Sequence, residues 1–274
     1  MNISVVIPCF NSQGTLKYTL DSLNKQTVSG FEIIVVDDGS FEEVVVPDNV
    51  KLIRHKQNLG IAASRNTGFK NSSREIVVFV DADVQLAEDF IENILNAYNS
   101  DVAGVGGRLD ETKKGSLGKW RSLYLRQHFG DKSINDIPML FGALSSYRKK
   151  VLQDLGGFDE FFKTNAEDVD FGIRLKKAGY ILGYTPYALG KHLRVDNFLG
   201  IIKNIFRWYY WGYKARQKNL LIDRNSANKE IKQIILQCKN NIYEDLFVHK
   251  NMFFPLMTMI NCFMKIITLI LVVG

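Results

Sequence analysis

Two aspartates, Asp81 and Asp83, follow an apolar segment with one alanine between them, in the stretch EIVVFVDADV (75–84). In extended backbone, residues two apart point to the same side, so these carboxylates lie close together. Like charges at close range repel unless a cation lies between them or one is protonated. Magnesium and manganese take oxygen ligands, and magnesium often binds one or two carboxylates plus substrate phosphates. The pair suits a metal–diphosphate clamp; a turn with solvated acids is the alternative.

Acidic side chains also open a predicted helix, in AEDVDF (166–171). Glu167, Asp168 and Asp170 fall in its first turn, where each acid stabilises the helix dipole by about 0.3–1 kcal/mol. Three acids exceed what capping requires, so one can cap the helix while another faces a substrate. A positioned carboxylate can accept a proton in a transition state, which makes this turn a candidate site for a general base.

Strands and helices alternate through the first 185 residues, and their order positions the acids. Strand-like apolar segments are 3–8, 31–36, 50–55, 75–80, 102–107 and 180–186, and amphipathic helices are expected at 15–26, 86–98 and 167–179. This alternation indicates an α/β fold with a mainly parallel central sheet flanked by helices. Ligands of such sheets bind beyond the carboxyl ends of the strands, where Asp81 and Asp83 lie. Polar residues 108–118 are expected to form a loop, and residues 119–129 a helix.

Another acidic pair, Asp37 and Asp38, follows the strand-like segment 31–36 at the same predicted edge of the sheet. Gly39 comes next. An ordinary Asx turn explains this pattern from the residues alone.

The composition excludes several classes of protein. The 274 residues suffice for one large domain, or a domain with an appendage, and 46% are hydrophobic. The net charge of +6 suits an anionic partner such as a phosphate ester or an acidic lipid surface. The three cysteines form no CxxC pair, which argues against a disulfide framework or zinc knuckle and fits a reducing compartment. The chain begins directly with a strand-like segment, so we expect no signal peptide.

A basic, aromatic helix is expected over 198–218, where seven aromatic residues and five Lys or Arg occur without an acid. Such a helix suits the interface of an anionic bilayer. A helix that covers a catalytic domain with snorkelling lysines is the alternative.

The most apolar segment is 251–274. A helix from Met252 would be roughly 35 Å long, enough to cross a bilayer. Four polar residues nevertheless form one stripe: Thr258, Asn261, Lys265 and Thr268. Such a helix lies in the membrane interface, or spans while it packs the stripe against another helix. A buried or oligomer-forming helix is the alternative.

Several motifs of the first 185 residues resemble those of the family 2 glycosyltransferases in type and order. They are VVIPCFN (5–11), VVDDGS (35–40), NLGIAASRNTG (58–68), VDADV (80–84), GGFDE (156–160) and EDVDFGIRLKKAGY (167–180). The resemblance implies the GT-A (Rossmann-like) fold. The resemblance fades after about residue 197, where the composition also shifts. We therefore expect a catalytic domain over 1–197 and, from composition, a helical, membrane-associating extension over 198–274.

The resemblance also assigns roles by position. Nucleotide-sugar contacts fall on Pro8, Phe10, Asn11, Asp38, Arg65, Asp81 and Ala82. The metal, Mn2+ or Mg2+, falls to Asp81, Asp83 and His192. Asp168 matches the family's general base, and Glu167 a neighbour that orients the acceptor. Two alternatives stay open: a structural salt bridge for Arg65, and a structural histidine at position 192.

The implied activity is that of an inverting glycosyltransferase, of the hexosyltransferase type, which moves a sugar from a nucleoside diphosphate to a glycan, polysaccharide or lipid-linked hydroxyl. A UDP-sugar is favoured over dTDP- and GDP-sugars. The expected location is the cytoplasmic side of a membrane, without nucleic acid, and with an oligomer through the C-terminal helices as an option. The alternatives are a catalytically silent binding subunit and a nucleotidyltransferase that forms sugar nucleotides.

Overall fold

The computed structural model describes residues 2–273, which form two compact units. The first unit comprises the chain up to Glu111 together with Gln127–Arg194. The second comprises Thr112–Arg126 together with the chain from Val195 onward. The expected boundary at residue 197 lies close to the end of the first unit, but the sequence did not assign Thr112–Arg126 to the helical unit.

An eight-stranded sheet forms the centre of the first unit, in the order β3-β2-β1-β4-β7-β6-β8-β5. Its strands are β1 (Ile3–Cys9), β2 (Glu32–Asp37), β3 (Lys51–Arg54), β4 (Ile76–Val80), β5 (Val84–Leu86), β6 (Val102–Asp110), β7 (Leu144–Arg148) and β8 (Ile181–His192). β1 to β4 pair in parallel, as do β6 and β8. β7 runs antiparallel to both β4 and β6, and β5 runs antiparallel to β8. Parallel pairs therefore outnumber antiparallel ones, as expected for a mainly parallel sheet, while β5 and β7 make the sheet mixed.

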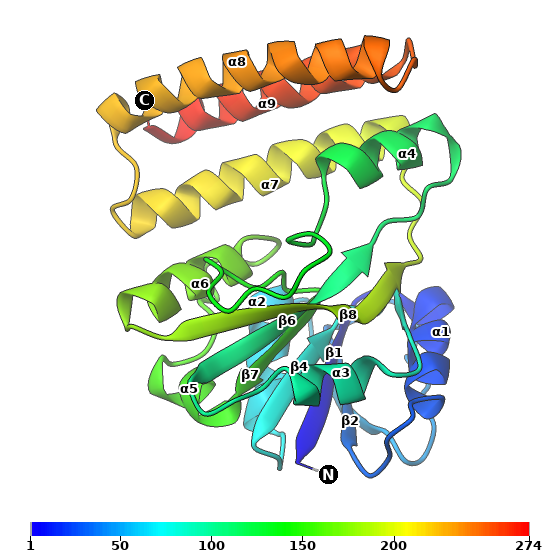
Figure 1. Ribbon diagram of the computed structural model, residues 1–274. Helices are drawn as coiled ribbons and strands as arrows, with labels where there is room; N and C mark the ends of the chain where they lie inside the picture. The colour runs from blue at the N-terminus through cyan, green and yellow to red at the C-terminus, as the bar shows by residue number, and fades with distance from the viewer. Residues whose placement is uncertain (1, 274) are drawn as a thin grey trace. The chain divides into compact units, whose positions relative to one another are not determined.

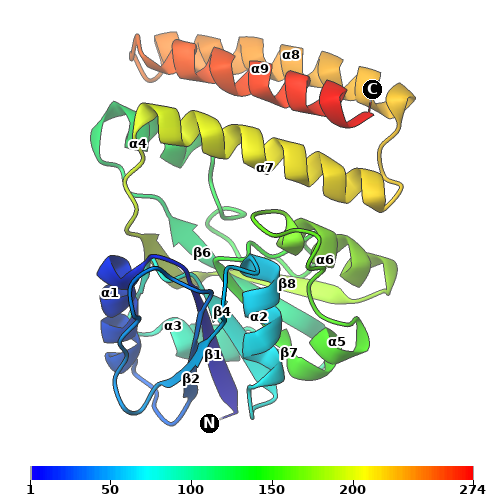
Figure 2. The ribbon, with the colours of Figure 1, turned by 180° about the vertical axis from the view of Figure 1, so that it is seen from behind.

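Helices cover both faces of this sheet (Figures 1 and 2). They are α1 (Gln13–Asn24), α2 (Ile61–Lys70), α3 (Phe90–Asn96), α5 (Lys149–Asp154) and α6 (Glu167–Lys177). α1 and α3 pack on one face, and α2, α5 and α6 on the other. β1, β2 and β4 are consequently buried on both sides, which explains their unbroken apolar runs. α2 lies so close to β1 that a Cβ on Gly68 would meet Cγ1 of Val6 at 2.1 Å.

The segment after Asp83 differs from the sequence expectation. Leu86 belongs to strand β5, where it pairs with Gly190 of β8, and α3 begins only at Phe90. A three-residue strand is too short to show an alternating pattern, so its identity comes from its pairing with β8.

Strand β8 also continues past Pro186, where we expected it to end. The register against β6 shifts between the pairs Gly106–Tyr184 and Arg108–Leu189. This irregularity lets the chain pass the proline, which cannot donate to the ladder. His192 therefore lies within β8 rather than in a following loop.

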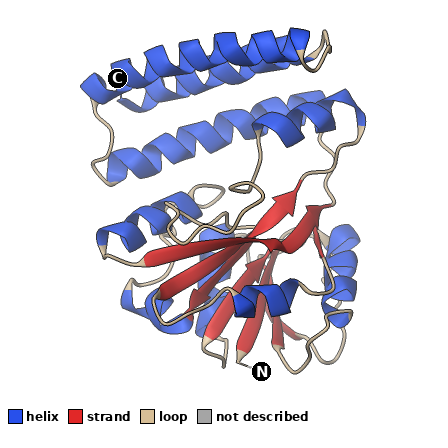
Figure 3. Ribbon diagram, viewed as in Figure 1, coloured by secondary structure: helices blue, strands red, loops and turns tan. Residues whose placement is uncertain are grey.

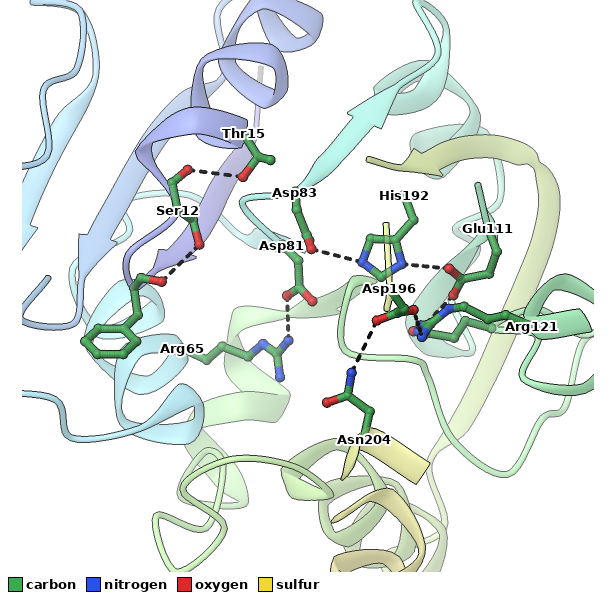
Figure 4. A network of polar contacts seen from close by, with 12 residues as sticks. Ser12, Thr15, Arg65, Asp81, Asp83, Glu111, Arg121, His192, Asp196 and Asn204 are labelled. Carbon is green, nitrogen blue, oxygen red and sulfur yellow. Dashed lines mark hydrogen bonds and ion pairs between the residues drawn. The ribbon is translucent and has the colours of Figure 1, made fainter. Parts of the chain in front are cut away.

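The described part of the second unit is helical (Figure 3). Its helices are α4 (Gly115–Tyr124), α7 (Phe198–Lys218), α8 (Arg224–Phe247) and α9 (Phe254–Val273). α9 packs against both α7 and α8. Nη1 of Arg121 on α4 lies 2.6 Å from Asp196, which also accepts a hydrogen bond from Asn204 of α7 (Figure 4). α8 lies within the extension that was expected to be helical, although the sequence analysis did not single it out as a separate helix, and α4 begins inside the predicted loop.

By length and composition, α9 is the one helix among residues 2–273 that could cross a membrane, with a mean hydropathy of 2.2. Its polar stripe of four residues was expected.

Candidate active site

Backbone hydrogen bonds hold the two aspartates of the DADV turn between β4 and β5. The amide of Asp81 donates to the carbonyl of Ala143 at 3.1 Å, and the carbonyl of Asp83 accepts from the amide of Leu193 at 2.8 Å. The side chains of Asp81 and Asp83 are 31% and 25% exposed, whereas Ala82 between them is buried. Both carboxylates therefore reach solvent while their backbone is fixed.

His192 lies between two carboxylates, as Figure 4 shows. Its Nε2 is 3.2 Å from Oδ2 of Asp83, and its Nδ1 is 3.1 Å from Oε2 of Glu111. Burial alone would lower the pKa of His192, but the bonds to Asp83 and Glu111 raise it to about 9. Although burial opposes it, the same bond from His192 lowers the pKa of Asp83. Glu111 was not predicted; it follows β6, in a segment that the sequence pattern assigned to a loop.

Arg65 on α2 links the DADV turn to the start of α6. Its Nη2 lies 3.0 Å from Oδ1 of Asp81, and its Nη1 donates to Oε1 of Glu167. Burial tends to lower the pKa of Arg65, but Glu167 and Asp81 raise it, so the guanidinium keeps its charge. Burial raises the pKa of Glu167 to about 7, against the opposing effect of Arg65. The salt bridge posed as the alternative for Arg65 and the contact with the DADV turn occur together.

Within this cluster two buried polar atoms have no hydrogen-bond partner among the described residues: Nε of Arg65 and Oε2 of Glu167. Unpaired buried polar atoms are rare in folded proteins, and a catalytic role is one of the explanations for them; groups with shifted pKa values, such as Glu167, cluster at functional sites. The cluster is therefore a candidate site in its own right.

The three acids in the first turn of α6 differ in burial and in their hydrogen-bond partners. Glu167 is buried against Arg65, and Asp170 pairs with Arg174 one turn later at 2.8 Å. Asp168 is half-buried, and its Oδ2 accepts from the amide of Gly142 at 2.9 Å. Because its partners are backbone amides rather than a cation, Asp168 is the acid of this turn best suited to accept a proton.

Asp37 and Asp38 both take part in local structure. The amide of Ser40 donates to Oδ1 of Asp37 at 2.9 Å, as the Asx-turn interpretation predicts. Asp38 is buried, and its carboxylate accepts from the amides of Leu59 and Gly60 at 2.9 and 2.8 Å. Asp38 thus anchors the loop that precedes α2; its role toward a nucleobase stays a prediction.

A cavity of ≈ 360 Å³ lies beyond the end of β1. Its lining residues are Asn11, Ser12, Gln13, Gly14, Ser40, Phe41, Glu42 and Val44. Asn11 links both sides of the cavity. Its backbone amide donates to Oγ of Ser40, and its side-chain Oδ1 accepts from the backbone amide of Phe41. The rings of Phe10 and Phe41 lie 6.0 Å apart and are both exposed. Pro8 is buried within β1, opposite Val36, and its contact with a nucleotide stays a prediction.

The residues at the DADV turn fit a divalent cation. Among residues 2–273, no group of three or more His, Cys, Asp or Glu side chains could hold a metal ion by itself. Asp83 and His192 nevertheless offer a carboxylate and an imidazole 3.2 Å apart. Glu111 binds Nδ1 of His192 and so directs Nε2 toward Asp83, the arrangement that supports histidine ligands in metal sites. Two such groups plus substrate phosphates form a set that magnesium or manganese accepts.

Comparison with known proteins relates more than half of this chain to one family. A family model described as Glycosyl transferase family 2 matches residues 4–156. A pre-mycofactocin glycosyltransferase of Mycobacterium tuberculosis is 31% identical over 208 residues, which are 70% of this chain and 42% of that protein. A GalNAc(5)-diNAcBac-PP-undecaprenol beta-1,3-glucosyltransferase of Campylobacter jejuni is 29% identical over 84% of this chain and 78% of its own length. The chain thus spans less than half of the mycobacterial relative.

Solved structures share the fold at low sequence identity. The mannosyltransferase PcManGT from Pyrobaculum calidifontis, in complex with GDP-Man and Mn2+, superposes with a TM-score of 0.64 at 20% identity, over 81% of this chain and 65% of that one. S. aureus TarS 1–349 in complex with UDP-GlcNAc gives a TM-score of 0.58 at 19% identity, over 78% of this chain and 66% of the TarS chain. Both confirm the GT-A-like arrangement of the sheet and its helices.

Proposed function

Because the chain belongs to glycosyl transferase family 2, we propose that it transfers a sugar from a nucleoside diphosphate to an acceptor hydroxyl, with inversion at the anomeric carbon. The observation that carries this proposal is the double contact of Arg65 with Asp81 and Glu167. It brings the acids suited to a metal–diphosphate clamp next to the helix turn that contains the candidate base, Asp168.

In the proposed reaction the acceptor oxygen attacks the anomeric carbon of the donor sugar. A carbon–oxygen bond forms on one face as the bond to the diphosphate oxygen breaks on the other. The hydroxyl proton passes to a carboxylate oxygen of Asp168, which contributes about 10²–10⁴-fold to the rate. Glu167, which lies next to it, orients the acceptor. No side chain forms a bond to the sugar.

Charge on the departing diphosphate is stabilised from two sides. The buried guanidinium of Arg65 supplies a positive charge held in place by its two carboxylate partners. Asp83 and His192, together with Asp81 beside them and the substrate phosphates, would hold Mn2+ or Mg2+, which would supply further positive charge there. Glu111 acts through His192 by fixing the orientation of the imidazole.

The nucleobase occupies the cavity braced by Asn11, with Phe10 and Phe41 as stacking surfaces. Asp38, Pro8 and the loop that Asp38 anchors support its wall. We favour a UDP-sugar over dTDP- and GDP-sugars. The solved neighbours include complexes with UDP-GlcNAc and with GDP-Man, which supports a nucleotide sugar as the donor class.

The acceptor is a glycan, a polysaccharide or a lipid-linked sugar. The name of the Campylobacter relative, which includes an undecaprenol-linked substrate, supports a lipid-linked one. We place the protein on the cytoplasmic side of a membrane, with catalysis in residues 1–197 and attachment through residues 198–274. The apolar helix α9 supports this attachment.

A donor screen tests the function. Purified protein with Mn2+ is incubated with UDP-, GDP- and dTDP-sugars, and release of nucleoside diphosphate is measured beside an Asp168→Asn control. We expect wild-type turnover with UDP-sugars and only background for the variant. Donor binding without nucleoside diphosphate release for any donor would favour a silent binding subunit. Pyrophosphate release from a nucleoside triphosphate and a sugar phosphate would indicate a nucleotidyltransferase.

A further inference from the structure

Helix α9 turns its polar side toward its neighbouring helices and its apolar side outward, the reverse of a helix in a water-soluble bundle. Its polar residues face the neighbouring helices: the hydroxyl of Tyr209 donates to Oδ1 of Asn261 at 3.0 Å, and the indole of Trp120 donates to Thr258 at 3.1 Å. Nζ of Lys265 lies 5.1 Å from the centre of the Tyr209 ring. On the opposite side, five apolar residues are each more than half exposed. These residues, here termed the outer stripe, are Leu256, Met259, Phe263, Ile270 and Leu271.

Helix α8 packs along α9 (Figures 1 and 2). It carries a second exposed apolar row. Its residues are Ile235, Leu236, Tyr243, Leu246 and Phe247. Lys232 and Lys239 are exposed and follow the same three- and four-residue spacing, so they lie on the same side of the helix. A helix face that combines lysines with large apolar side chains is typical of the membrane interface.

The charge of the chain is concentrated in this helical unit. Residues 112–126 and 195–274 contain 16 Lys and Arg and 5 Asp and Glu, a net charge of +11. The remaining residues contain 19 Lys and Arg and 24 Asp and Glu, a net charge of −5. The two parts together give the net charge of +6 of the whole chain. Only the helical unit is therefore complementary to an anionic surface.

We propose that α8 and α9 form a surface that docks in the plane of a bilayer containing anionic lipids, with the outer stripe inserted at the boundary between headgroups and acyl chains. This inference specifies the membrane attachment in the proposed function. Transfer of the exposed apolar side chains out of water is favourable, and the surrounding lysines bind the phosphate groups of the lipids.

The neighbours of α9 argue against a membrane-spanning helix. α7 and α8 flank α9, and both carry charged residues along their length; those of α7 are Lys203, Arg207, Lys214, Arg216 and Lys218. If α9 crossed the hydrocarbon core in this arrangement, these charges would have to enter it, which is strongly unfavourable. Lying in the plane exposes only the outer stripe to lipid and leaves the charges at the surface.

Vesicle binding tests the proposal without any sugar donor, so its outcome is independent of catalysis. Full-length protein is sedimented with vesicles of phosphatidylcholine alone, or with about one-third phosphatidylglycerol. We expect binding mainly to the anionic vesicles, reduced in high salt because exposed charges are screened. The double variant Met259→Gln/Phe263→Gln should bind at least about tenfold more weakly.

Two controls separate this effect from unfolding. Tyr187→Gln changes a large exposed residue of the first unit, and its vesicle binding should equal that of wild type. Helix content and UDP affinity of the double variant should also equal those of wild type. Unchanged vesicle binding by the double variant would overturn the proposal. Loss of a stable dimer in that variant, with no vesicle binding by either protein, would assign the outer stripe to a second copy and also overturn it.

Insertion depth distinguishes lying from spanning. Single cysteines are introduced as Leu256→Cys, Phe263→Cys and Ile270→Cys in a background without the native cysteines, labelled with bimane, and quenched by nitroxides at the lipid headgroup or deep in the acyl chain. The ends of this series are about 21 Å apart along a helix. An in-plane helix gives the same shallow depth at all three positions. A deep middle position between two shallow ones would show a spanning helix and contradict the proposal.

Discussion

Nε2 of His192 lies 3.2 Å from Oδ2 of Asp83, although the two residues are far apart in the sequence of the first unit. The contact depends on the antiparallel pairing of β5 with β8, in which Val84 is the partner of His192. The edge of the sheet thus joins the carboxylate of the DADV turn to an imidazole that Glu111 orients from its other side.

Glu111→Ala should weaken Mn2+ binding by about 10–100-fold, the usual effect of removing the partner of a histidine ligand. Glu111→Gln should keep part of the affinity, because its amide oxygen can still accept from Nδ1 of His192. Mn2+ binding is measured directly by electron paramagnetic resonance in the absence of donor. Asp110→Asn, which alters a neighbouring, more exposed acid, is the control. If Glu111→Ala bound Mn2+ with the affinity of wild type, Glu111 would have no part in metal binding.

Asp168→Asn should lower kcat by about 10²–10⁴-fold and leave the Kd of the donor unchanged. Asparagine keeps an oxygen that can accept from the amide of Gly142, so the fold should persist. Asp170→Asn is the matched control in the same turn, because it breaks an ion pair with Arg174 away from the proposed reaction. It should lower the free energy of unfolding but retain kcat. If Asp168→Asn turns over normally, another group is the base.

Arg65→Met should reduce the free energy of unfolding by about 3–5 kcal/mol, because it leaves Glu167 buried without its cationic partner. Adding Glu167→Gln should recover part of that loss, which urea denaturation can measure as a double-mutant cycle. Lys150→Met is the control: its side chain is 82% exposed, and its partner Asp154, 3.0 Å away, is 40% exposed, so the expected loss is about 1 kcal/mol or less. Equal losses for Arg65→Met and Lys150→Met would contradict the burial argument.

Phe41→Ala should weaken binding of UDP by about threefold to tenfold, because it removes a stacking surface worth about 0.5–1.5 kcal/mol at the cavity rim. Binding of Mn2+ alone should not change. Phe161→Ala removes another exposed ring of the first unit and serves as the control. Calorimetric titration with UDP gives the affinities of the two variants. Equal affinities would show that the nucleobase does not stack on Phe41.

The sequence pattern was sufficient for the strands that are buried on both faces. β1, β2 and β4 form unbroken apolar runs, and a ligand site at the carboxyl end of β4 follows from that pattern alone. The resemblance to a known family then singled out Arg65 and Asp168, which the structure joins through Glu167.

Other parts of the site depend on contacts that a local pattern does not encode. Glu111 lies in a polar stretch and gains its role from a histidine 81 positions later. β5 has three residues, and β8 contains a proline that suggested an early end. Phe41 follows the acidic turn without a periodic signal, and only the cavity beside it distinguishes it from an ordinary exposed aromatic residue.

The most direct test of the central claim is a calorimetric titration of UDP into wild-type and Asp83→Asn protein, each with and without Mn2+. The proposed clamp predicts that Mn2+ strengthens UDP binding to wild type by about tenfold or more, equivalent to about 1.4 kcal/mol. It also predicts that Asp83→Asn removes this gain while the variant remains folded. Four equal affinities would contradict a metal–diphosphate site at the DADV turn.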